Sequence, residues 1–350
     1  MTWQPVEPAA RIRPLSISFS REAGKTMHLL QVANVGQICG GTAACAWTIA
    51  RALPHCRHTV AFLSSIVPET RAAFGDVPVL QWQQVTARHV AAVNPDLVIL
   101  HNTSPDRVRG PLPSFTLLYQ HSAGGRAAAD ATVCCSRWLV RRCRPAETDA
   151  DEPPPVLIQP VPRPPRPEGF ETRALRAHPV VGRLCTPVDR KWPRELVPFY
   201  ARLARRFPQV EWEFVGCPSH LEPSLWEACG ERVRFHRPSW AARSLLWTWD
   251  ALLYHHPTLT ESFGRVVAES MRAGCVPIVD ARGGFCEQIV PGAGFLCRDA
   301  ADFVAALALV ERAGERRTLS RAAMSQGDRL CGMHAFAIRL RRLLQARMRD

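Results

Sequence analysis

The most informative stretch of the chain is Thr260-Glu261-Ser262-Phe263-Gly264-Arg265-Val266-Val267-Ala268-Glu269. Glu261 precedes an apolar segment with helical spacing, and Glu269 lies inside that segment. Eight residues at about 100° each return to within roughly 80° of the starting face, so we expect both carboxylates to serve one cleft. Phe263 and Gly264 fall at the predicted helix N-terminus, where free backbone N–H groups favour an anion.

A short apolar strand and a glycine-rich turn are predicted after this helix. The strand is Cys275-Val276-Pro277-Ile278-Val279, and the turn is Gly283-Gly284-Phe285-Cys286-Glu287. A cap on the helix that follows the turn is one interpretation of Glu287.

The two acids resemble a known family signature: a Glu, seven residues and a second Glu, with Phe-Gly just after the first. This is the pattern of the retaining glycosyltransferases of the GT-B fold, group 4 (glycosyl transferases group 1). The resemblance implies that Glu261 contacts the hexose of a nucleotide sugar and that Glu269 binds the ribose hydroxyls. It also implies that the backbone of Phe263 and Gly264 holds the distal phosphate. Two acids on a solvated helix face are the alternative interpretation of the pair alone.

Two cations upstream extend the resemblance. Gly182-Arg183-Leu184 and then Lys191 are similar to the family's Gly-Arg and Lys, which grip the phosphates. Breaking the anomeric bond leaves negative charge on the outer phosphate. The planar guanidinium of arginine and the compact ammonium of lysine both suit a diphosphate. Trp192 stands where the family usually has Gly, so the loop departs from the pattern. Arg183 and Lys191 as solvated surface cations are the alternative.

The first half of the chain offers weaker site candidates. Gly40 and Gly41 open a helix after the first predicted strand, where the family has a glycine loop that meets donor and acceptor. They lack the full G-x-G-x-x-G pattern, so an ordinary turn is the alternative. His121 follows a strand, and the resemblance places it close to the donor sugar as a catalytic residue. His101 and Asn102 end the preceding strand and are candidates for the acceptor side.

The chain is long enough for two domains of ordinary size, with 350 residues. Both halves alternate continuously apolar strands with helices, which predicts parallel sheets covered on both faces. We expect a poorly ordered extension at 1–26, with Met27 as a candidate natural start, and a Rossmann-like acceptor-side domain at 27–150. A Pro-rich linker follows at 151–175, then a Rossmann-like nucleotide-sugar-binding domain at 176–330 and a helix at 331–350 that packs back on the first domain. The predicted fold is α/β GT-B, with two sheets facing across a cleft.

The net charge of +13 comes almost wholly from arginine, because lysine occurs only at Lys25 and Lys191. This basic surface favours phosphate-bearing ligands and allows peripheral contact with the inner face of an anionic membrane. A nucleic-acid binder would cluster basic and aromatic residues, whereas these arginines are spread along the chain. We therefore expect no nucleic-acid partner.

Thirteen cysteines, an odd number, lie scattered through apolar segments, which is typical of reduced cysteines buried in a cytosolic protein. No Cys-x-x-Cys pair and no zinc-like histidine spacing occurs. No apolar run approaches the roughly 20 residues of a membrane span, and the N-terminus lacks a signal-peptide core. We expect a cytoplasmic protein without a cofactor or an obligatory metal.

The main hypothesis is a glycosyltransferase that moves a hexose from a nucleotide diphosphate sugar to a hydroxyl acceptor with retention. A glycan, a lipid-linked saccharide and a small metabolite all stay open as acceptors. One alternative is a GT-B nucleotide-sugar epimerase, which would need further acid and base residues facing the sugar. Another is a non-catalytic protein that binds a sugar nucleotide.

Overall fold

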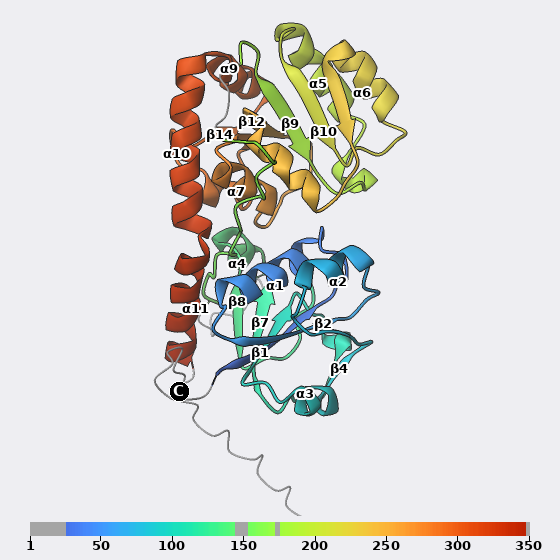
Figure 1. The fold of residues 1–350 in the computed structure, drawn as a ribbon, viewed down its shortest axis with the longest axis vertical. Coiled ribbons are helices and arrows are strands. Elements are labelled where there is room, and N and C mark those ends of the chain that lie inside the picture. Colours follow the sequence, from blue (N-terminus) through green and yellow to red (C-terminus); the bar gives the residue numbers. More distant parts are fainter. Residues whose placement is uncertain (1–25, 144–152, 172–175, 348–350) are drawn as a thin grey trace, which may run out of the picture.

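The computed structural model describes residues 26–143, 153–171 and 176–347. Two α/β domains are stacked along the long axis of the molecule, and the chain crosses between them (Figure 1). The α/β GT-B prediction is confirmed. The predicted extension falls outside the described residues, except for its last residue, Thr26.

The first domain contains a six-stranded parallel sheet in the order β3-β2-β1-β5-β7-β8. The parallel sheet that the alternation of apolar strands and helices predicts is therefore present, and its short edge strand β3 is only partly buried. The strands are β1 (His28–Ala33), β2 (Arg57–Phe62), β3 (Val79–Gln81), β5 (Leu97–His101), β7 (Phe115–Gln120) and β8 (Ala131–Cys134). Its helices are α1 (Gly41–Ala52), α2 (Pro68–Phe74), α3 (Ala87–Val93) and α4 (Arg137–Cys143), and β4 (Val85–Thr86) pairs with β6 (Val108–Arg109).

The second domain repeats this topology, with a parallel sheet in the order β11-β10-β9-β12-β13-β14. Its strands are β9 (Val180–Leu184), β10 (Glu211–Val215), β11 (Val233–His236), β12 (Ala251–Tyr254), β13 (Val276–Asp280) and β14 (Phe295–Cys297). Its helices are η3 (Asp189–Lys191), α5 (Leu196–Arg206), α6 (Glu222–Cys229), η5 (Ala241–Trp247), α7 (Arg265–Arg272), α8 (Phe285–Gln288), α9 (Ala300–Glu311) and α10 (Ala313–Cys331). In each sheet the strand order reverses beside the first strand, and ligands bind beyond the carboxyl ends of strands at such a point.

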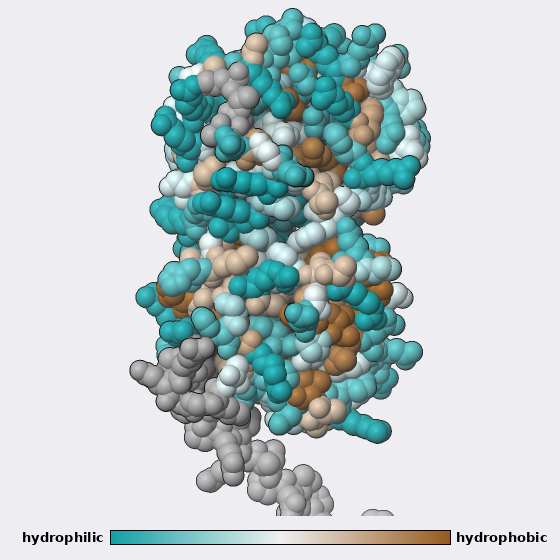
Figure 2. Space-filling model, viewed as in Figure 1, coloured by the Kyte–Doolittle hydropathy of each residue, from teal (hydrophilic) through white to brown (hydrophobic). Residues whose placement is uncertain are grey.

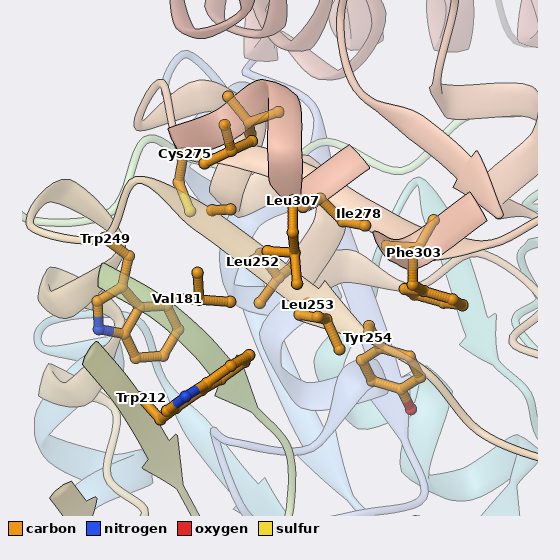
Figure 3. Close-up of a cluster of buried hydrophobic side chains, with 14 of the residues drawn as sticks. Val181, Trp212, Trp249, Leu252, Leu253, Tyr254, Cys275, Ile278, Phe303 and Leu307 are labelled. Atoms are coloured by element: carbon orange, nitrogen blue, oxygen red, sulfur yellow. The ribbon is translucent and has the colours of Figure 1, made fainter. Parts of the chain in front are cut away.

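Large aromatic side chains fill the core of the second domain (Figure 3). Trp249 lies across β9 at Gly182, where a Cβ atom would come within 2.1 Å of the indole ring. The glycine of the predicted Gly-Arg motif is therefore needed for packing. Tyr254 has its ring in this core, and its hydroxyl points away from the other labelled side chains (Figure 3).

Part of the predicted Pro-rich linker packs on the first domain. Leu157 and Val161 are buried in the core of that domain. Val156 forms a bridge to Cys134, and Leu157 N donates to Cys134 O at 2.9 Å. This part of the linker therefore extends the edge of the first sheet beyond β8. Burial of its apolar side chains favours this position.

Helix α11 (Met333–Arg347) follows α10, and the two run along one side of both domains (Figure 1). Phe336, Leu340 and Leu344 recur every four residues on one face and are buried against the first domain. Burial of three such side chains contributes about 1.5–3 kcal/mol each. α11 therefore fastens the second domain to α1 of the first.

Hydrophilic residues dominate the face drawn in Figure 2, and apolar residues appear in smaller groups on both domains. Among the described residues, no helix combines the length and apolar character that crossing a bilayer requires.

Candidate active site

Lys191 and Glu261 meet beyond the carboxyl ends of β9 and β12, where the order of the second sheet reverses. Lys191 Nζ donates to Glu261 Oε1 at 2.8 Å, and Tyr254 Oη donates to the same oxygen at 2.8 Å. The Lys191 and Glu261 side chains are 23% and 21% exposed, so ligands can reach both. The structure thus brings together two of the predicted site residues that lie 70 positions apart in the sequence.

The carboxyl of Glu261 is held ionised by this arrangement. Burial acts to raise its pKa, but the Lys191 ammonium, the Tyr254 hydroxyl and the nearby Arg190 guanidinium together hold the pKa below its usual value. Glu261 is therefore a fixed hydrogen-bond acceptor rather than an acid at neutral pH.

Arg183 does not reach the ligand space, contrary to the prediction that it grips phosphate. Its side chain is completely buried, and its guanidinium lies 4.9 Å from the centre of the Trp192 ring and 4.6 Å from that of Tyr254. It donates to the carbonyls of His255 and Lys191, each at 2.8 Å. Arg183 therefore positions the backbone that carries Lys191, and Trp192 shields it from solvent.

His256 is a site residue that the sequence analysis missed. Its Nδ1 accepts from the N–H groups of Thr258 and Leu259 at 3.1 and 2.7 Å, so its Nε2 carries the proton and donates to Arg190 O at 2.8 Å. Burial lowers the pKa of His256, which keeps the ring neutral. One imidazole thus ties the loop before Lys191 to the loop before Glu261. Its place directly after an apolar strand and five residues before Glu261 was the available signal.

The predicted helix start at Phe263 and Gly264 is present, because α7 begins at Arg265 with Gly264 as its N-cap. Gly264 has φ +79°, a left-handed conformation that favours glycine, and a Cβ atom there would lie 2.2 Å from Phe285. No hydrogen bond between described residues uses the N–H of Phe263 or Gly264. Gly284 of the predicted glycine turn donates its N–H to Glu261 O at 2.9 Å, so the turn supports the acid from behind.

Glu269 is almost fully buried, and both of its oxygens lie 3.2 Å from Arg243 Nε. Arg265 approaches the same carboxylate at 3.9 Å. A carboxylate offers about four lone-pair sites, so two guanidinium contacts leave capacity for a further donor. Arg243, in η5, was not singled out from the sequence.

The loop with Gly40 and Gly41 faces the second domain. Gly40 is the N-cap of α1, and the preceding Cys39 lies next to Arg243. Nearby, Trp47 packs edge-on against Trp240 at 5.1 Å, and Glu69 accepts from Trp240 N at 2.9 Å. The glycine loop of the first domain and the Arg243–Glu269 pair of the second domain therefore lie close together across the interface between the domains.

Arg265 connects three parts of the chain from the first turn of α7. It donates to Gln159 Oε1 at 3.2 Å and Pro160 O at 3.0 Å in the linker, and to Thr48 Oγ1 of α1 at 3.0 Å. Its side chain is only 9% exposed. These bonds fix the helix N-terminus of the second domain against the first domain.

A chain of hydrogen bonds runs from this linker contact to the first sheet. Gln159 Nε2 lies 2.8 Å from His121 Nδ1, His121 Nε2 lies 2.9 Å from His101 Nδ1, and His101 Nε2 lies 3.1 Å from Gln31 Oε1. Gln31 donates onward to Ala46 O, so one set of neutral tautomers satisfies every ring nitrogen. Burial lowers the pKa of both histidines, to about 3 for His101.

The prediction that His101 lines the acceptor side is wrong, because its ring has no exposed surface. Asn102 has φ +52°, and its Oδ1 accepts from the N–H groups of His121 and Ser122 at 3.2 and 3.0 Å. Asn102 therefore shapes the turn that presents His121. His121 itself is half-buried and stays a candidate for contact with the donor sugar.

Cys45, His101 and His121 place one ligand atom each within 4.8 Å of one another, the kind of set that can hold a metal. The ring nitrogens are already hydrogen-bonded, and burial raises the pKa of the Cys45 thiol to about 12. A metal here would have to displace the bond between the two rings. An Asp-x-Asp triplet, Asp149-Ala150-Asp151, also occurs in the sequence and lies outside the described residues.

Glu287 does not cap the helix that follows the glycine turn. Its two oxygens instead accept from the N–H groups of Arg137 and Trp138 at 2.8 and 2.7 Å, so it caps α4 of the other domain. The sequence could not predict this contact, because the partners are about 150 positions apart.

Residues 192–326 match the family model described as glycosyl transferases group 1. This segment is a glycosyl transferases group 1 domain. The group 1 domain includes Glu261, Phe263, Gly264 and Glu269, and it begins directly after Lys191. No curated protein sequence matches the chain significantly.

Solved structures extend the likeness of the group 1 domain to the whole fold. HepE of Anabaena, solved in complex with UDP-glucose, has 16% identity over 91% of this chain and 100% of its own, with a TM-score of 0.70. A glycosyltransferase from Rickettsia africae has 12% identity over 93% and 99%, with a TM-score of 0.70. The sucrose-phosphate synthase of Thermosynechococcus elongatus has 15% identity over 91% and 99%, with a TM-score of 0.66. At these identities the likeness shows the fold.

Proposed function

We propose that the chain is a glycosyltransferase that moves a hexose from a nucleotide diphosphate sugar to a hydroxyl acceptor with retention of configuration. The observation that carries the proposal is the Lys191–Glu261 pair beside the N–H groups of Phe263 and Gly264, which bond to no described residue. Lys191 directly precedes the segment that matches glycosyl transferases group 1, and the other three residues lie inside it. HepE, which has the same fold, was solved with UDP-glucose, and this supports a uridine diphosphate donor.

In the proposed reaction Lys191 and the helix N-terminus take up the charge that develops on the outer phosphate. Glu261 accepts hydrogen bonds from the donor hexose. Glu269 is almost fully buried against Arg243, so its proposed contact with the ribose hydroxyls requires the Arg243 side chain to move. The anomeric carbon–oxygen bond breaks, the acceptor oxygen bonds to the same carbon on the same face, and the acceptor proton passes to a phosphate oxygen. Arg183 acts through the backbone of Lys191.

Nucleotide binding is tested first by thermal unfolding with and without uridine diphosphate. A ligand at 100 times its Kd stabilises the folded state by about 2.7 kcal/mol, so the unfolding temperature should rise. Glu269→Ala should weaken this effect, because the ribose contact is lost. A protein that no nucleoside diphosphate stabilises would contradict the proposal.

Transfer is tested by hydrolysis across a panel of nucleotide sugars. Lys191→Ala should slow turnover by about 100-fold or more, since removing one fixed donor to a developing oxyanion costs about 3 kcal/mol. Arg194→Ala removes an exposed charge from the same loop and is the matched control. Full activity in Lys191→Ala would overturn the site assignment. We also propose that no metal is obligatory, so activity should survive a chelator.

A further inference from the structure

An open cleft of about 730 Å³ lies between the two domains, next to the proposed donor site. Trp138 and Arg142 of α4 form its wall on the first domain, and Arg190, His256, Thr258 and Thr260 line the second. Arg190 directly precedes Lys191, and Thr260 directly precedes Glu261. The cleft therefore opens where a second substrate could approach the donor.

The walls of this cleft carry unpaired positive charge. Arg142 and Arg190 are exposed, come from opposite domains, and take part in no ion pair between described residues. Asp189 also lines the cleft, but its side chain is 81% exposed and lies 3.7 Å from His220. Two guanidinium groups thus face the cleft against one solvated carboxylate, and guanidinium binds carboxylate and phosphate in a two-pronged geometry.

Both walls are held in place before any ligand arrives. Glu287 fixes the first turn of α4, and with it Trp138, through two backbone N–H groups. His256 bonds to Arg190 O on one side and to the Thr258 and Leu259 N–H groups on the other. Preorganised walls bind a ligand at a smaller cost in conformational entropy.

The other residues that line the cleft indicate the chemistry of the uncharged part of the ligand. Trp138 is half-buried and presents an aromatic surface to the cleft, while Thr258 and Thr260 offer hydroxyls. An aromatic face with nearby hydrogen-bonding groups suits a sugar ring, and the volume is typical of a small-ligand site. A nucleic acid would need a longer basic track with several stacking residues.

We propose that this cleft binds the acceptor, and that the acceptor is a saccharide carrying an anionic group, either a carboxylate or a phosphate. The inference rests on the proposed function, because it assigns the second substrate of the same site. The anion lies between Arg142 and Arg190, and the sugar ring packs on Trp138 with its hydroxyl directed toward the donor.

The test measures binding by ligand-observed NMR in the presence of saturating uridine diphosphate. The probes are methyl glucuronide for a carboxylate, glucose 6-phosphate for a phosphate, and methyl glucoside as the neutral ligand. At least one anionic probe should bind about tenfold more tightly than the glucoside. Arg142→Gln and Arg190→Gln should each reduce that binding about tenfold. Arg142→Gln should also leave the affinity for uridine diphosphate unchanged, because Arg142 lies on the other domain from Lys191 and Glu261.

Arg141→Gln is the matched control, because Arg141 is exposed on the same helix and does not line the cleft. Equal binding of all three probes, or no binding of either anionic probe while uridine diphosphate still binds, would overturn the inference and leave the proposed function standing. If the Arg142→Gln or Arg190→Gln variant changes its preference between UDP-glucose and UDP-glucuronic acid without a change in probe binding, the inference is also overturned. The arginines would then contact the donor rather than the acceptor. If the unmodified protein does not bind uridine diphosphate, that result counts against the proposed function and not against the inference about the acceptor.

Discussion

Replacing Gly264 by alanine should destabilise the second domain and loosen the site at the same time. The new Cβ atom would lie 2.2 Å from Cε1 of Phe285, whose side chain is only 2% exposed. Phe285 packs edge-on against Tyr254 at 5.4 Å, and Tyr254 donates to Glu261. A displaced Phe285 therefore transmits the change to the acid.

The cost has two parts that can be estimated separately. A residue with a Cβ atom in the left-handed region costs about 1–2 kcal/mol relative to glycine. Forcing extra volume into a packed core costs about 1–3 kcal/mol. Together these predict a loss of about 2–5 kcal/mol in the free energy of unfolding, measured by urea unfolding with tryptophan fluorescence.

A second substitution separates the two parts. In Phe285→Leu the shorter side chain lacks the ring atoms nearest the new methyl group, so Gly264→Ala in that background should cost only the backbone part, about 1–2 kcal/mol. Gly41→Ala is the opposite control, because no atom lies within 4 Å of its added Cβ and its position in α1 favours alanine. The reasoning is refuted if Gly264→Ala unfolds at the wild-type urea concentration, or if Phe285→Leu leaves its cost unchanged.

Three further outcomes are expected. Because burial lowers the pKa of His101 to about 3, its contribution to stability is complete above pH 6.5 and declines as the pH falls toward 3; about 2 kcal/mol should be lost between pH 7 and pH 5, and an unchanged urea midpoint would contradict this. Tyr254→Phe removes a hydrogen bond that lowers the pKa of Glu261, so the acidic limb of the pH–activity profile should move up by about one unit, whereas a structural role alone would lower activity at every pH. Arg265→Gln should cost about 3 kcal/mol in urea unfolding, because buried groups of both domains lose their donor, while exposed Arg88→Gln should cost less than about 0.5 kcal/mol.

Much of the fold follows from local sequence pattern. Short, continuously apolar runs such as Leu97–Leu100 favour buried parallel strands, and the two parallel sheets predicted from the alternation of strands and helices are present. The start of α7 was equally readable, because Gly264 and the apolar residues after it mark a helix start. Edge strands β3 and β14 and the short pair β4 and β6 were not predicted, since partly buried strands of two or three residues carry no clear period.

The features of the site also divide into those that the sequence predicts and those that only the structure shows. The sequence by itself determined which chemical groups belong together in a motif, including Glu261 just before α7 and Glu269 inside it, at a fixed spacing. Only the tertiary structure decided that Arg183 is buried behind Lys191, that Arg243 pairs with Glu269, and that Glu287 caps a helix of the other domain. A motif records spacing along the chain, whereas burial and pairing depend on which distant segments the two sheets bring beside it. Residues such as His256 and Arg243 acquire their roles from those neighbours, and no local pattern encodes them.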